Sequence, residues 1–152
     1  MRVSRVAPIF AALGMCLASP AQAGAMSGAE KLRRLDIMLM VTGLRCRAGR
    51  DDFMADYGRF TTRQMGSLNG AERELRQEIF ARYGTFDGRR ALDRLETVMA
   101  NDYGRGHPWL DCGELKQVTR NLAEVEGRAT LEEAADQLLA RNGSPQIVLA
   151  KR

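Results

Sequence analysis

The only histidine and the only tryptophan of the chain lie two positions apart, in the segment His107-Pro108-Trp109. An imidazole can act as a general base or a ligand, and an indole offers a large apolar face with one hydrogen-bond donor. Because Pro108 stiffens the segment, we interpret His107 and Trp109 as candidate binding residues. The competing interpretation is structural: Trp109 covers the end of a helical bundle, while His107 caps a helix or faces solvent.

Two arginines, Arg45 and Arg47, flank Cys46 near the predicted end of a helix. Guanidinium groups bind carboxylates and phosphates well, so we include Arg45 and Arg47 among the candidate binding residues. Cations near a helix C-terminus also stabilise its last carbonyl groups, and this structural interpretation stays open.

The first 23 residues have the layout of a secretory signal peptide. Two arginines precede an apolar run, Val6–Ala18, and the small residues Ala21 and Ala23 follow at a cleavage site. The run is shorter than the roughly 20 residues needed to span a bilayer. We therefore predict cleavage after Ala23 and a periplasmic or secreted mature chain, 24–152, without a membrane span. The alternative is a retained anchor or a lipidated Cys16.

Cleavage leaves two cysteines, Cys46 and Cys112. An even pair in an exported chain predicts a disulfide. It would close a loop of about 67 residues and stabilise the fold by about 4 kcal/mol in the chain-entropy model. Metal ligation would need further ligands, and a redox dithiol usually has closely spaced cysteines. We therefore predict a structural disulfide and no metal site.

Several functional classes are not supported by composition or motifs. The net charge of +4 falls to +2 without the two arginines of the leader, and the basic residues are spread along the chain, so no nucleic-acid binding is predicted. The chain lacks a phosphate-binding loop, a dinucleotide fingerprint and a c-type haem motif, so no cofactor is predicted. No serine lies in a nucleophile elbow. Carboxylate pairs such as Glu72 with Glu74 are typical of solvated helix faces.

Apolar residues recur at intervals of three and four, and no segment alternates with period two. The most apolar stretch, 35–46, is apolar on most of its circumference and is predicted to be the central buried helix, beginning near Ser27. Other helices are predicted over 53–83, 85–103, 111–125 and 130–139, with capping boxes at Asp111–Glu114 and Thr130–Glu133 and with Leu92, Leu95, Val98 and Met99 on an inner face. For 53–83 one long, kinked helix is favoured over a break at Asn69-Gly70.

The predicted fold is therefore all-α: a single-domain bundle of four to five helices with one disulfide. The predicted organisation is a signal peptide (1–23), a helical bundle domain (24–143) and a C-terminal tail (144–152).

Three segments carry a resemblance to a known family: KLRRLDIMLMVTGLRCR (31–47), DDFMADYGRF (51–60) and NDYGRGHPWLDCGELKQV (101–118). The chain resembles an uncharacterised family of small exported bacterial proteins, some of which carry the label S-adenosyl-L-homocysteine hydrolase. The resemblance implies an exported, disulfide-linked helical fold. Enzymes of that named class are several times longer and hold a nicotinamide cofactor on a dinucleotide-binding fold, for which this chain has no glycine fingerprint.

We therefore expect a non-enzymatic binding or interaction module of the periplasm or envelope. Its expected partner is an envelope protein or a small apolar ligand. The alternative function is a hydrolase in which His107 is the general base.

Overall fold

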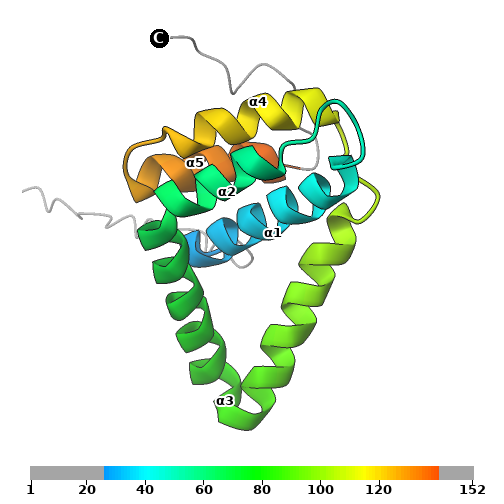
Figure 1. Cartoon of the computed structure of the whole chain (residues 1–152). Helices are drawn as coiled ribbons and strands as arrows, with labels where there is room; N and C mark the ends of the chain where they lie inside the picture. The colour runs from blue at the N-terminus through cyan, green and yellow to red at the C-terminus, as the bar shows by residue number, and fades with distance from the viewer. Residues whose placement is uncertain (1–25, 141–152) are drawn as a thin grey trace, which may run out of the picture.

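The computed structural model describes residues 26–140, and within this range the chain forms five α-helices and no strand (Figure 1). The predicted all-α fold is confirmed. The predicted signal peptide and C-terminal tail lie outside the described residues. The helices are α1 (Gly28–Cys46), α2 (Met54–Arg63), α3 (Met65–Tyr103), α4 (Cys112–Ala123) and α5 (Arg128–Leu139).

The central helix of the fold is α1, which contacts all four other helices. It begins at Ser27, whose hydroxyl accepts a hydrogen bond from the backbone N–H of Glu30. Its core side chains are fully buried: Leu32, Leu35, Met38 and Leu39. The apolar surface is not covered all round, because Met40 and Leu44 are 37% and 46% exposed. The prediction of a buried central helix is thus confirmed, with one partly open side.

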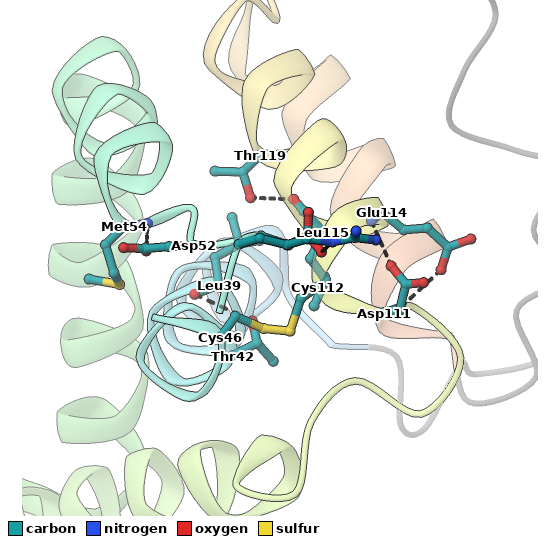
Figure 2. Close-up of a disulfide and its surroundings, with 12 residues drawn as sticks. Leu39, Thr42, Cys46, Asp52, Met54, Asp111, Cys112, Glu114, Leu115 and Thr119 are labelled. Atoms are coloured by element: carbon teal, nitrogen blue, oxygen red, sulfur yellow. Dashed lines mark hydrogen bonds and ion pairs between the residues drawn. A yellow bond between two sulfur atoms is a disulfide. The ribbon is translucent and has the colours of Figure 1, made fainter. Parts of the chain in front are cut away.

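A disulfide between Cys46 and Cys112 joins the end of α1 to the start of α4 (Figure 2). The two Cα atoms are 5.8 Å apart. Asp111 caps α4 and forms the predicted capping box with Glu114. The predicted pairing is confirmed, and it fixes one end of each of these two helices at the same place.

The chain turns a sharp corner at Gln64, between α2 and α3 (Figure 1). The buried side-chain amide of Gln64 donates hydrogen bonds to the carbonyls of Leu122, at 3.0 Å, and Val125, at 2.8 Å. These two contacts satisfy acceptors at the end of α4 and hold the corner against it. The predicted single helix over 53–83 is therefore wrong, and the break is at Gln64, whereas Asn69-Gly70 lies inside α3.

Two helical arms joined at Gly84 make up α3. Gly84 has φ 73° and ψ 174°, a conformation that glycine adopts without steric cost. It divides the 39 residues into arms of equal length, 65–83 and 85–103, each roughly 28 Å long. The arms diverge from Gly84, and α1 runs across their wide end (Figure 1). The predicted helix end at Tyr83-Gly84 is confirmed.

Ion pairs attach the second arm of α3 to α1. The guanidinium of Arg33 donates two hydrogen bonds to Glu96, at 2.9 and 2.7 Å. Arg34 of α1 lies 2.9 Å from Asp102, which follows Glu96 on the same arm of α3. These contacts tie the wide end of the hairpin to the central helix.

The first arm of α3 is attached to α5 through Arg128, which forms a bidentate pair with Glu74 at 2.6 and 2.7 Å. The same side chain donates to Glu132, so it also orders the first turn of α5. This helix begins at Arg128, with Gly127 as N-cap. The predicted capping box of Thr130 and Glu133 is therefore wrong, because both residues lie inside the helix.

Candidate functional site

His107 is hydrogen-bonded to the backbone through both of its ring nitrogens. Nδ1 accepts from the N–H groups of Leu110, at 3.2 Å, and Trp109, at 3.4 Å. Nε2 lies 3.0 Å from the carbonyl oxygen of Leu138. Because a carbonyl oxygen only accepts, we assign the proton to Nε2 and the neutral form to the ring. Burial of the imidazole lowers the pKa of His107, which also favours the neutral form. No ring nitrogen is left to take a proton from a substrate.

Trp109 has a similar structural role. Its indole N–H donates to the carbonyl of Ala140 at 3.2 Å, and the ring packs against the core. The rings of His107 and Trp109 meet edge to face, with centroids 4.6 Å apart. Together the two side chains hold the C-terminal end of α5 through Leu138 and Ala140. These contacts support the structural interpretation of the loop.

A hollow of about 730 Å³ lies beside this loop. Its walls include His107, Arg105 and the Arg34–Asp102 ion pair, with Leu139 on the apolar side. Arg34 is paired with an acid and therefore offers no uncompensated charge to an anionic ligand. The hollow could admit a small molecule, but its polar groups are mostly engaged with the protein.

Arg45 and Arg47 are both exposed at the end of α1, and neither has an ion-pair partner among residues 26–140. The side chain of Arg45 lies against Gly106, where a Cβ atom would be 3.4 Å from its Nε. Arg45 therefore joins His107 and Trp109 at one end of the molecule. The structure shows no such contact for Arg47. Exposed guanidinium groups of this kind contribute little to stability.

No group of three or more His, Cys, Asp or Glu side chains in residues 26–140 could hold a metal ion. None of the helices formed by these residues is both long enough and apolar enough to cross a bilayer.

A second hollow lies between the two arms of α3 and was not predicted. This groove has a volume of about 900 Å³. Leu75 and Ile79 line it from the first arm, and Leu95 and Val98 line it from the second. Val98 is 47% exposed. The residues Met26, Ser27 and Glu30, at the start of α1, complete the groove.

The charged residues of the groove carry both signs. Glu78 and Arg82 stand on the first arm, and Asp87, Arg90 and Arg94 stand on the second. An apolar strip between charged borders is the usual form of a surface that binds another protein element.

The periodicity of apolar residues predicted which face of the second arm is apolar, but not that this face lines a groove. Val98 has the spacing of an inner helix face, in register with Leu95. Val98 lines the groove between the arms, but the prediction that it is buried there is wrong, because it is 47% exposed where the two arms diverge. Leu92 and Met99, by contrast, are buried as predicted.

Comparison with protein-family models, curated proteins and solved structures finds no match to the chain. The resemblance to the family of small exported proteins therefore stays a prediction.

Proposed function

We propose that this chain is an exported, non-enzymatic binding module, and that the groove between the arms of α3 receives an amphipathic helix of an envelope protein. The observation that carries the proposal is the apolar lining of the groove, in which Val98 of the second arm is exposed and Leu95 is partly buried against the core. Leu95 and Val98 continue the helical spacing of the core, yet Val98 is nearly half exposed. Apolar surface that forms a strip between charged borders is typical of an interaction site.

A helix fits this groove better than an extended peptide does. Both walls are themselves helices, and their apolar residues recur with helical spacing: 75 and 79 on one arm, 91, 95 and 98 on the other. A third helix with an apolar stripe can pack its ridges between them. Because the borders carry acids and arginines, the partner helix is expected to have charged flanks of both signs.

The proposed compartment has two supports. The first 23 residues have the charged, apolar and small-residue layout of a signal peptide. The Cys46–Cys112 disulfide is compatible with an oxidising compartment, where such bonds persist. The family resemblance agrees with both.

The alternative hydrolase is less well supported by the geometry. It requires His107 as a general base, but both nitrogens of that ring are held by backbone groups. A base must have a nitrogen within reach of the proton that it removes. In the hollow beside His107, Arg34 and Asp102 are paired with each other.

Photo-crosslinking in the native host tests the proposal. A photoreactive phenylalanine analogue at Val98 is expected to give an adduct with an envelope protein, and digestion should map the adduct to a helix. The matched control position is Met65, which is 54% exposed but does not line the groove. Equal adducts at both positions would contradict the proposal. So would an adduct of Val98 within its own chain only, or a small apolar molecule recovered from the purified protein in place of a protein adduct.

A further inference from the structure

We infer that the closed end of the α3 hairpin docks on an anionic phospholipid surface. This end consists of Tyr83, Gly84, Phe86 and the arginines beside them, and we call it the hairpin tip. The inference goes beyond the proposed function. Arg82, Tyr83 and Arg90 also line the end of the groove, but Phe86 and Arg89 do not, and the inferred ligand is a lipid surface and not a helix.

The hairpin tip exposes two aromatic side chains. Phe86 is 69% exposed and Tyr83 is 51% exposed, whereas Phe53 and Phe60 in the bundle are fully buried. An exposed phenyl ring and an exposed phenol match the boundary between lipid headgroups and acyl chains, since the apolar rings can enter it while the hydroxyl stays hydrated.

Three arginines lie close to these rings in the sequence: Arg82, Arg89 and Arg90. All three are exposed, and none has an ion-pair partner among residues 26–140. The guanidinium of Arg90 lies 4.4 Å from the centre of the Phe86 ring, so a cation and an aromatic face are presented together. Asp87 is the only acid between residues 79 and 92. The tip is therefore cationic, and guanidinium groups bind lipid phosphates in this setting.

The shape of the tip suits a flat partner. The two arms converge at Gly84, at the far end of the molecule from α4 and α5, so the bundle does not obstruct a planar surface (Figure 1). Phe80 turns inward and lies against Gly88, where a Cβ atom would be only 2.5 Å from the ring. This close contact fixes the ends of both arms, while Tyr83 and Phe86 stay outside. A projecting, cationic tip with exposed aromatic side chains favours a membrane surface.

Vesicle co-sedimentation tests the inference with the oxidised protein purified after export. We expect binding to vesicles of equal parts phosphatidylglycerol and phosphatidylcholine at low salt, weakening as salt is added, and little binding to pure phosphatidylcholine. The paired change Tyr83→Ala and Phe86→Ala should weaken binding at least about tenfold. The paired change Arg82→Gln and Arg89→Gln should weaken it about 25-fold, since each arginine contributes roughly a factor of five near an anionic surface.

Matched variants separate the tip from general charge and apolarity. Arg50→Gln with Arg73→Gln removes two exposed cations elsewhere, and Leu44→Ala with Met65→Ala removes two exposed apolar side chains. Both control pairs should bind like the parent protein. The inference is overturned if the parent does not bind anionic vesicles, or if the control pairs lose as much binding as the tip pairs. It is also overturned if light scattering shows a dimer that the Tyr83 and Phe86 changes dissociate, because the tip would then contact a second copy of the chain.

Discussion

Phe60 and Phe86 illustrate how the two halves of this molecule differ. Phe60 is fully buried in the bundle of α1, α2, α4 and α5, whereas Phe86 is 69% exposed at the end of the α3 hairpin. In the bundle, polar side chains such as Gln64 and His107 are bound to backbone groups. In the hairpin, apolar and cationic side chains face solvent. The arms of α3 also bury Leu75, Leu92 and Met99, so the difference lies between the packed core and the exposed hairpin tip, and the surfaces proposed for binding lie on the hairpin.

Removing the disulfide of the bundle should cause the largest loss of stability, far larger than a substitution at the hairpin tip. Replacing both Cys46 and Cys112 by serine is expected to lower the free energy of unfolding by about 4 kcal/mol, because the open chain gains conformational freedom in the unfolded state. Chemical denaturation of parent and variant under identical conditions measures the loss. A comparable loss from Tyr83→Ala, at the hairpin tip, would break the division proposed between bundle and hairpin.

The two phenylalanines provide a direct test with the same substitution. Phe60→Ala should cost at least about 3 kcal/mol of stability, since it leaves a cavity in the core. Phe86→Ala should change stability by less than about 0.5 kcal/mol, because the ring is mostly solvated. Thermal and urea unfolding of both variants measures the two losses of stability. If the two losses were similar, Phe86 would have to be packed in solution and the hairpin would belong to the core.

Local sequence signals predicted much of the fold. Ser27, Asp111 with Glu114, and Gly84 act on backbone groups a few residues away, so the helix ends that they set could be located from the sequence. The disulfide followed because only two cysteines remain after the predicted leader.

Features that depend on distant partners could not be located in this way. The corner at Gln64 is fixed by carbonyls of Leu122 and Val125, which lie some 60 positions further along the chain. The groove depends on the angle between the arms of α3, and the spacing of Val98 cannot show whether a neighbour covers it. Arg128 begins α5 by binding Glu74, a contact that overrides the local capping pattern at Thr130. Among the candidate site residues, His107 and Trp109 make hydrogen bonds to the end of α5, and the exposed hairpin has no motif by which the sequence could identify it.

The corner at Gln64 is the next test, because it connects the bundle to the hairpin. Gln64→Met keeps the approximate shape of the side chain but removes both hydrogen-bond donors. We expect a loss of about 2 kcal/mol, since the carbonyls at the end of α4 would be left without these partners in a buried setting. Denaturant unfolding measures it. Gln117→Met serves as the control: Gln117 is exposed and its amide bonds only to Asn121, so that change should cost far less.

Titration of His107 should have the smallest effect on the free energy of unfolding, and this effect depends on pH. Burial lowers the pKa of His107 in the folded chain below its unfolded value of roughly 6.5. Between these two pKa values the unfolded chain binds more protons than the folded chain does. The contribution of neutral His107 is therefore complete above pH about 6.5 and is lost as pH falls toward the folded pKa. The effect is small because the ring is only partly buried and its hydrogen bond to Leu138 opposes the effect of burial on the pKa.

The stability difference between the parent protein and His107→Gln isolates this contribution. We expect the difference to narrow between pH 7.5 and pH 5.5, as the parent loses its advantage. The comparison with the variant is needed because burial also raises the pKa of Asp36. Titration of Asp36 changes the free energy of unfolding with pH in the opposite direction, and it cancels in the difference because both proteins contain Asp36. Glu114, the acid that acts on His107 from α4, is also present in both. A difference that stayed constant over this range would mean that His107 is exposed in solution. The loop would then belong with the hairpin as an available binding surface, and the bundle would lose one of the contacts that close it.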